Sequence, residues 1–293
     1  MNDNFPVKFT NLEDPDYPDL LSKISSPPEI IFIKGAPANN KKAIAVVGTR
    51  KSSELGKKIA YDFSYKLAQN GCVIVSGLAL GIDSAAHSGA LDSNGVTWAV
   101  LAHGLDSVYP ATNTKLAQRI LSSGGSLISE YPEKTPPYSN QFILRNRIIS
   151  GLAAAVLIIE APEESGALAT AKFALKQNRP VFVVPGSISS GLYSGSHNLI
   201  RGGARLATSA EDILDDMGWT IRKAGKKNTD IIIEDKIQRI IFDTIRADGN
   251  YLSVDKICQI TKLKPREANI ALTQMAFEGI IIDDGGKYRI SKF

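Results

Sequence analysis

The chain has 293 residues, 43% of them hydrophobic, and its 34 basic and 30 acidic residues give a net charge of +4. This length predicts one large domain with a smaller one. The two cysteines, Cys72 and Cys258, lie far apart in apolar stretches, which argues against a disulfide framework, and the three histidines form no metal-binding cluster. The N-terminus lacks the pattern of a signal peptide and no apolar run reaches membrane-spanning length, so we expect a cytoplasmic protein with no membrane partner.

Charge is spread unevenly along the chain. Residues 1–40 carry three basic and six acidic side chains, and residues 41–220 carry seventeen and fourteen. Residues 221–229 carry four basic side chains and no acidic one, and residues 230–293 carry ten of each. Binding of phosphates by charge is therefore expected in the central region or in the basic stretch that follows it.

The first forty residues contain several prolines and a short strand-like run at 30–33. We predict an N-terminal extension that packs on the main body, because so short a segment does not form a core of its own. From residue 41 to residue 220, six apolar runs alternate with helix-like stretches. Runs that are apolar on both faces predict a parallel sheet covered by helices on both sides, and thus the α/β class. The six runs are 43–48, 72–77, 97–102, 126–130, 154–159 and 180–184.

The C-terminal part has a different pattern. Residues 221–229 are basic and are interpreted as a flexible linker. Residues 235–247, 254–261 and 265–278 then predict three helices, and a turn at 283–286 predicts a short hairpin. Three helices and a hairpin are typical of a winged helix, so we predict a small winged-helix domain at 230–293.

Ligands of parallel sheets bind beyond the carboxyl ends of the strands, so the loops there hold the candidate residues. After the first run, Gly48 allows close approach of a phosphate to the backbone, Thr49 follows it, and Arg50 adds a positive charge. The same segment also fits a tight turn with a surface arginine. It matches neither a dinucleotide-binding glycine motif nor a P-loop, so NAD and ATP are not indicated.

After the second run, Ser76, Gly77 and Gly81 could form a concavity of backbone amides that binds an anion. Asp83 is expected to cap the N-terminus of a helix at 84–91. His87, within that helix, is expected to be packed in the core.

Residues 142–147 combine an aromatic ring with polar and basic side chains. Phe142 could stack on a base while Arg145, Asn146 and Arg147 contact phosphates. Lys134, in the proline-rich loop before them, could add charge. The alternative is a helix start with Phe142 in the core and both arginines in solvent.

The fifth run ends at Glu160, which could orient Arg145 or Arg147, bind a ribose hydroxyl or form an ion pair. The next helix opens with small residues that permit a phosphate or sugar to approach closely, namely Ser165, Gly166 and Thr170. Further along, Ser196 and Asn198 could bind phosphate or sugar. The histidine between them has no paired nucleophile, which is weak evidence for acid–base catalysis.

Taken in order, these stretches resemble the DprA/Smf family of DNA-processing proteins. The resemblance covers about residues 15–215, and eight ordered motifs are far more specific than any one of them. The lead-in YPDLLSKISSPPEIIFIKG (17–35) also matches. The motifs are VVGTR (46–50), SGLALGID (76–83), GGSLISEYP (124–132), FILRNRIISGL (142–152), IIEA (158–161), SGALATA (165–171), RPVFVVPG (179–186) and GSHNLIRGGA (195–204).

The resemblance implies an extended Rossmann-like fold and a homodimer that binds single-stranded DNA with little sequence preference. It implies a protein that is not an enzyme and needs no cofactor, and that loads the RecA recombinase during natural transformation. The family's basic pocket maps to Arg50, Phe142 and Arg145. Some members carry a lysine just before the aromatic, where this chain has Ser139 and Asn140, and Lys134 could substitute for it.

Two other functions are alternatives for this sequence. Nucleoside-monophosphate phosphoribohydrolases share the fold superfamily, but their catalytic glutamate would fall at Phe173, which leaves no carboxylate for glycosidic-bond hydrolysis. A winged-helix transcriptional regulator is the other alternative. Asp283 and Asp284 in the wing would repel phosphates, and zero net charge argues against strong duplex binding.

Overall fold

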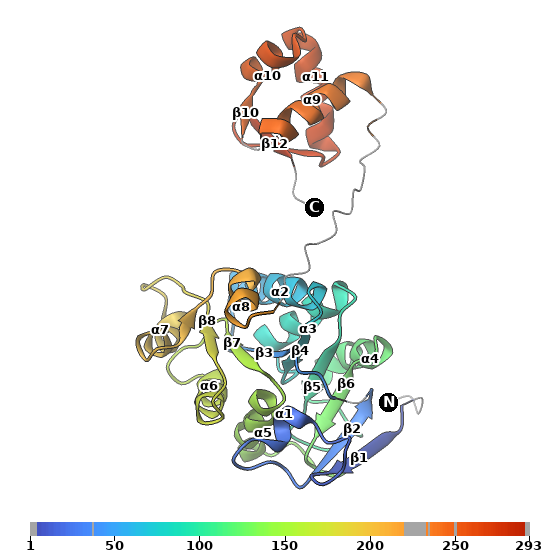
Figure 1. The fold of residues 1–293 in the computed structure, drawn as a ribbon, viewed down its shortest axis with the longest axis vertical. Helices are drawn as coiled ribbons and strands as arrows, with labels where there is room; N and C mark the ends of the chain where they lie inside the picture. The colour runs from blue at the N-terminus through green and yellow to red at the C-terminus, as the bar shows by residue number, and fades with distance from the viewer. Residues whose placement is uncertain (1–4, 37, 220–232, 234, 249–250, 291–293) are drawn as a thin grey trace. The chain divides into compact units, whose positions relative to one another are not determined.

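The computed structural model describes residues 5–36, 38–219, 233, 235–248 and 251–290 (Figure 1). The chain forms two compact units, Met1–Ala224 and Gly225–Phe293. The basic stretch that we interpret as a linker, residues 221–229, lies outside the described residues. Within the described ranges, no helix has the length and apolar character needed to cross a membrane.

A nine-stranded sheet forms the centre of the larger unit, in the order β1-β2-β6-β5-β4-β3-β7-β8-β9 (Figure 1). All six predicted runs are strands of this sheet, and every pairing among them is parallel. The prediction of an α/β unit with a parallel sheet is therefore confirmed. The six strands are β3 (Ala43–Val47), β4 (Val73–Ser76), β5 (Thr97–Val100), β6 (Ser126–Ser129), β7 (Ala155–Ile158) and β8 (Val181–Val183).

Three further strands lengthen the sheet at its two edges. β2 (Ile30–Gly35), the predicted strand-like run, pairs antiparallel with β6, and β1 (Val7–Asn11) pairs antiparallel with β2. β9 (Arg205–Leu206) pairs in parallel with β8 at the other edge. The sequence did not predict β1 and β9, because one of the five residues of β1 and neither residue of β9 is buried.

Helices cover both faces of the sheet. One face carries α1 (Asp19–Ser22), α5 (Ser139–Gly151), α6 (Gly166–Lys176) and α7 (Ser194–Arg201). The opposite face carries α2 (Glu54–Gln69), α3 (Ile82–Asp92), α4 (Thr114–Ser122) and α8 (Ala210–Asp216). Two short 3-10 turns, η1 (Ala111–Asn113) and η2 (Gly191–Tyr193), precede α4 and α7.

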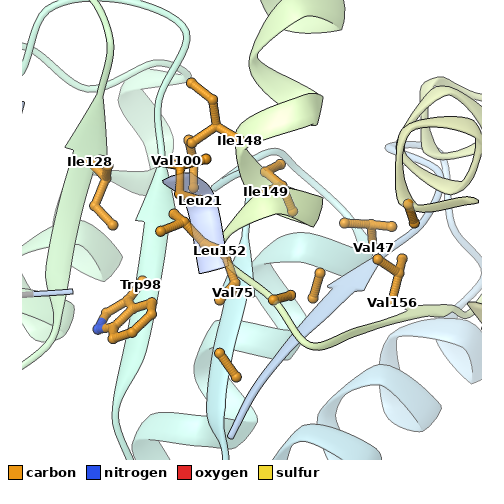
Figure 2. Packing of buried hydrophobic residues seen from close by; sticks show 14 of the residues in the cluster. Leu21, Val47, Val75, Trp98, Val100, Ile128, Ile148, Ile149, Leu152 and Val156 are labelled. Carbon is orange, nitrogen blue, oxygen red and sulfur yellow. The ribbon is translucent and has the colours of Figure 1, made fainter. Parts of the chain in front are cut away.

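The strands are apolar throughout because both of their faces are buried. In β3, Val47 packs into the core under α5, whereas Ile44 and Val46 pack into the core under α2 and α3. Figure 2 shows the first of these cores, where Ile148 and Ile149 of α5 approach the strands. This packing fixes α5 on the sheet, and α5 carries the stretch at 142–147.

His87 is fully buried in α3, as predicted, and its Nδ1 lies 2.7 Å from Thr97 Oγ1. Burial, reinforced by the positive charge of Arg145, lowers the pKa of His87 to about 3. An unfolded histidine has a pKa of about 6.5, so the unfolded state takes up the proton first as the pH falls. The contribution of His87 to the free energy of unfolding is therefore fully present above about pH 6.5, and it is lost as the pH falls toward the folded pKa.

We expect the free energy of unfolding to fall by up to about 1.4 kcal/mol per pH unit below about pH 6 on account of His87. Burial also lowers the pKa of His103, which adds a change in the same direction. Urea unfolding at a series of pH values checks this, with His87→Gln as the variant. An unchanged pH slope in His87→Gln would contradict the assignment, whatever the variant's absolute stability.

The smaller unit contains α9 (Lys236–Asp248), α10 (Val254–Thr261) and α11 (Pro265–Phe277). A three-stranded sheet in the order β10-β12-β11 accompanies them, formed by β10 (Leu252–Ser253), β11 (Ile281–Asp283) and β12 (Lys287–Ile290). All three predicted helices and the hairpin are present. The core of the unit contains Ile241, Leu272 and Met275.

Candidate functional site

The carboxyl ends of β3 and β7 are neighbours at the point where the chain changes its direction across the sheet. From β3 the chain proceeds to β4, β5 and β6 on one side, and α5 then leads back to β7 on the other side of β3. In open parallel sheets, ligands bind in the crevice at such a switch point. A cavity of about 850 Å³ lies here.

The lining of the cavity comes from the end of β3, from the loops after β3, β4, β5, β6 and β7, and from α3, α5 and α6. The structure brings nine of the predicted site residues together at this place, although they span more than a hundred positions in the sequence. The nine are Gly48, Thr49, Arg50, Phe142, Arg145, Asn146, Ser165, Gly166 and Thr170.

Arg50 and Phe142 meet in the cavity. The guanidinium carbon of Arg50 lies 5.0 Å from the centre of the Phe142 ring, within the range of a cation–π interaction. The ring of Tyr109 lies against the Phe142 ring, with 5.7 Å between ring centres and an angle of 56° between the planes. A positive charge and two aromatic rings therefore share one wall of the cavity.

Sequence reasoning missed Tyr109 and Lys51, both of which line the cavity. Lys51 directly follows Arg50. Tyr109 comes from the loop after β5, whose carboxyl end faces the same edge of the sheet as that of β3. An aromatic residue in that loop was the signal that could have identified it.

The N-terminus of α6 opens into the cavity. Ser165 is the N-cap residue, and its hydroxyl accepts a hydrogen bond from Ala167 N at 3.3 Å. Gly166 is exposed, and a Cβ added to it would have no neighbour within 4 Å. Free backbone donors and the helix dipole make such a terminus suitable for an anion.

The amide concavity predicted after β4 is already filled by the protein itself. The Asp83 carboxylate accepts hydrogen bonds from Gly77 N at 3.1 Å and Ala79 N at 3.4 Å. The prediction that Asp83 caps a helix beginning at residue 84 is wrong, because α3 begins at Ile82 with Gly81 as its N-cap residue. Burial raises the pKa of Asp83, and the nearby Arg145 opposes this.

Ser76, Gly77 and Gly81 hold this loop together and do not line the cavity. Ser76 is buried, and its hydroxyl donates to Val46 O at 2.7 Å. A Cβ on Gly81 would collide with the carbonyl oxygens of Thr49 and Arg50. Phosphate contacts at Ser76, Gly77 and Gly81 stay a prediction. In the structure these residues make contacts within the protein.

Arg145 is buried, with 4% of its surface exposed, and its guanidinium is committed to the protein. One terminal nitrogen donates to Gly77 O at 3.0 Å and to Val100 O, so Arg145 ties α5 to the ends of β4 and β5. Burial lowers the pKa of Arg145 to about 10, and the neighbouring Asp83 opposes this shift. The predicted phosphate contact at Arg145 stays a prediction, and its guanidinium already has partners within the protein.

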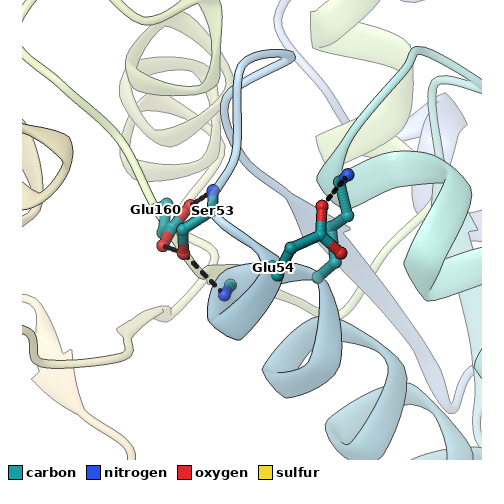
Figure 3. A network of polar contacts seen from close by, with 5 residues as sticks. Ser53, Glu54 and Glu160 are labelled. Atoms are coloured by element: carbon teal, nitrogen blue, oxygen red, sulfur yellow. Dashed lines mark hydrogen bonds and ion pairs between the residues drawn. The ribbon is translucent and has the colours of Figure 1, made fainter.

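Arg147 and Glu160 have partners that the sequence did not predict. Arg147 forms an ion pair with Glu130 at 2.6 Å. The fully buried carboxylate of Glu160 instead accepts hydrogen bonds from Ser53 (Figure 3). It also accepts one from the Tyr193 hydroxyl, so the predicted pairing of Glu160 with an arginine is wrong.

Lys134, Ser196 and Asn198 lie outside the cavity lining. Lys134 is exposed in the loop before α5, and its backbone amide donates to Asp106 Oδ1 at 2.7 Å. Ser196 is fully buried, and its hydroxyl accepts from Ala161 N at 3.2 Å. Asn198 is exposed on α7.

Comparison with known proteins points to one family. The family model described as DNA recombination-mediator protein A matches residues 8–218. Protein Smf of Escherichia coli is 44% identical over 202 residues, which cover 69% of this chain and 54% of that protein. DNA processing protein DprA of Streptococcus pneumoniae is 44% identical over 211 residues, which cover 72% of this chain and 73% of that protein. The chain thus spans about half the length of the Escherichia coli relative.

Two solved structures agree with these relatives. The X-ray structure of DprA from Streptococcus pneumoniae has a TM-score of 0.68 and 41% identity, and the match covers 73% of this chain and 75% of that one. A structure of DNA processing protein A from Helicobacter pylori, described as revealing its single-stranded DNA binding mode, has a TM-score of 0.65 and 28% identity. That match covers 74% of this chain and 98% of the other.

Proposed function

The chain belongs to the DNA recombination-mediator protein A family, and from this premise we propose that it binds single-stranded DNA in the cavity between β3 and β7. The observation that carries the proposal is the Arg50 guanidinium over the Phe142 ring at the sheet's switch point. Arginine attracts phosphate, an aromatic ring stacks on any base, and together these groups favour a single strand with little sequence preference.

In the mechanism we propose, the strand runs along the carboxyl edge of the sheet. Arg50 and Lys51 contact phosphates on one side, and the N-terminus of α6 at Gly166 receives a phosphate on the other. Phe142 and Tyr109 offer their rings to bases. Binding needs no covalent step, and the positive charges make it weaken with salt.

We also propose that the protein acts as a homodimer and delivers the strand to the RecA recombinase, in keeping with the family's description as a recombination mediator. Dimerisation places two cavities on one strand and raises avidity. Sedimentation of the full chain, with RecA assembly on a single strand followed with and without it, tests this. A monomer in sedimentation would contradict the proposed homodimer. RecA assembly that is unchanged by the protein would contradict the proposed delivery to RecA.

For the smaller unit we propose a winged-helix domain whose role is contact with protein. Its three helices and hairpin support the fold. Asp283 and Asp284 lie at the hairpin turn, where a wing would meet a phosphate backbone, and residues 230–293 carry equal numbers of basic and acidic side chains. Both features disfavour duplex binding.

Fluorescence anisotropy with labelled oligo-dT and a matched duplex, across a salt series, tests the proposed function. We expect a preference for the single strand that is shared by mixed sequences and weakens with salt. Equal binding of the duplex, or binding independent of salt, would overturn the proposal.

Replacing Phe142 with alanine is expected to weaken binding of oligo-dT by about 1–2 kcal/mol, or roughly five- to thirtyfold. The loss lies in the lower part of the usual range for base stacking, because a base that stacks on Phe142 replaces the contact of the ring with Arg50. The net gain from stacking in the wild type is therefore smaller. The salt dependence should not change, since no charge is removed. Phe142→Tyr keeps the ring and serves as the control. Equal losses in both variants would argue against stacking.

A further inference from the structure

Glu160 is a buried carboxylate that plays no direct part in the proposed binding of DNA. It follows β7 and is fully inaccessible to solvent. One carboxylate oxygen accepts from the Ser53 hydroxyl at 2.5 Å, and the other accepts from Ser53 N at 2.9 Å (Figure 3). The first oxygen also accepts from the Tyr193 hydroxyl at 3.1 Å. A buried charge is tolerated only when it is well hydrogen-bonded, and these neutral donors supply such bonds.

The backbone of the same residue holds a second point of the β3–α2 loop. Glu160 O accepts a hydrogen bond from Thr49 N at 2.7 Å. One residue thus anchors the loop at Thr49 and again at Ser53. Arg50 and Lys51, two cationic residues of the cavity lining, lie between these anchors.

Resting on the proposed function, we propose that Glu160 is a positioning residue for DNA binding. Its carboxylate fixes the end of the loop and its carbonyl fixes the start, so that the loop between them presents Arg50 to Phe142. Glu160 acts through Ser53 and does not itself touch the DNA.

The start of α2 is shaped to receive this carboxylate. Ser53 is the N-cap residue, and its hydroxyl also accepts from Gly56 N at 2.9 Å. A Cβ on Gly56 would collide with the Glu160 carboxyl group, so the glycine makes room for it. A negative charge at a helix N-terminus is favourable. The Glu160 carboxylate thus occupies the N-terminus of α2.

Glutamine weakens the hydrogen bonds at this position, because bonds to a charged carboxylate are stronger than bonds to a neutral amide. Its amide has one oxygen and one NH₂ group, whereas the carboxylate accepts hydrogen bonds on both oxygens. In Glu160→Gln the NH₂ group would face either Ser53 N–H or the pair of hydroxyls. The loop end is then held less firmly, while the shape of the side chain is nearly kept.

Oligo-dT binding by Glu160→Gln, measured with the full chain, tests the proposal. Removing a negative charge near a DNA-binding cavity strengthens binding if only electrostatics act. The proposal expects the opposite, a weakening of about three- to tenfold, the size of a lost hydrogen bond. In the Arg50→Ala background, Glu160→Gln should cause little further loss, because the residue that it positions is already gone.

Glu54→Gln is the matched control. It removes the same charge next to Ser53, but the Glu54 side chain is exposed and pairs with Lys57 at 2.7 Å. We expect its affinity to be unchanged or slightly higher. Unchanged or tighter binding by Glu160→Gln, or a full additional loss in the Arg50→Ala background, would overturn the proposal.

If Glu160→Gln does not fold, Tyr193→Phe and Ser53→Ala each remove a hydroxyl donor and keep the carboxylate. A weakening by both variants that disappears in the Arg50→Ala background supports the proposal, and normal binding by both contradicts it. Wild-type protein that ignores oligo-dT would instead refute the proposed function, so the two failures are distinguishable.

Discussion

Replacing Arg145 with leucine is expected to lower the free energy of unfolding by about 3–5 kcal/mol, because the buried guanidinium is lost together with its hydrogen bonds and its favourable influence on the buried Asp83. The Asp83 carboxylate would stay buried near an apolar side chain, and Gly77 O and Val100 O would lose the donor that they share. Urea unfolding followed by tryptophan fluorescence measures the change. Both tryptophans, Trp98 and Trp219, lie in the larger unit, so the signal reports on the unit that holds Arg145.

The second variant needed is Arg145→Leu combined with Asp83→Asn. Asparagine can still accept a hydrogen bond from Gly77 N, but it leaves no unpaired charge. We expect part of the stability to return in the double variant. If the double variant is as unstable as Arg145→Leu, the loss comes from the carbonyl contacts and not from the charge of Asp83.

The pH dependence gives an independent check. Arg145 lowers the pKa of Asp83 against the larger effect of burial, so its removal raises that pKa further. A carboxyl with a raised folded pKa destabilises the fold at pH values above its unfolded pKa, and it recovers as it takes up a proton. The deficit of Arg145→Leu relative to wild type should therefore narrow as the pH is lowered from neutrality toward the unfolded pKa of about 4. A deficit that widens would contradict this.

Replacing Arg50 with alanine is expected to weaken oligo-dT binding by about 1.5–3 kcal/mol, more than tenfold, because a hydrogen bond to a charged group is lost. The fall of the binding constant with salt should also become shallower, by about 0.7 in the logarithmic slope, for each lost phosphate contact with a single strand. Anisotropy across a salt series gives both quantities. Folding should be unaffected, since Arg50 is exposed.

Lys134→Ala is the matched control for Arg50→Ala. It removes the same charge from an exposed residue that does not line the cavity. A site at the cavity predicts a much smaller loss for Lys134→Ala. If both variants lose affinity equally, general electrostatic attraction explains the binding and the cavity is not the site.

The parts of the fold that depend on burial could be predicted from the sequence. Strands such as β3 and β7 are apolar on both faces because helices cover both sides of the sheet, and this burial produces continuous apolar runs. The start of α11 was also readable, because Pro265 suits the first turn of a helix. β1 escaped prediction since it is largely exposed and its sequence lacks an apolar pattern.

The partners of the polar residues could not be predicted. Glu160 bonds Ser53, which lies 107 positions away, and no local pattern links the two. Asp83 folds back on amides that could equally have bound an anion. A charged residue in a helix, such as Arg145, is expected at the surface, but tertiary packing buries it. The sequence thus identified nine of the residues that line the cavity, but not which of them already have partners within the protein.

The position of the Arg50 guanidinium over the Phe142 ring affects how long a DNA strand stays bound. A base that stacks on this face must displace the guanidinium, so the ring exchanges one neighbour for another. Each of the four bases displaces the same group, the Arg50 guanidinium. The affinity for DNA is therefore reduced equally for each base, and this step favours none of them. Since differences in affinity within one interface lie mostly in the dissociation rate, this uniform reduction shortens residence on the cavity. Short residence would suit the proposed transfer of the strand to the RecA recombinase.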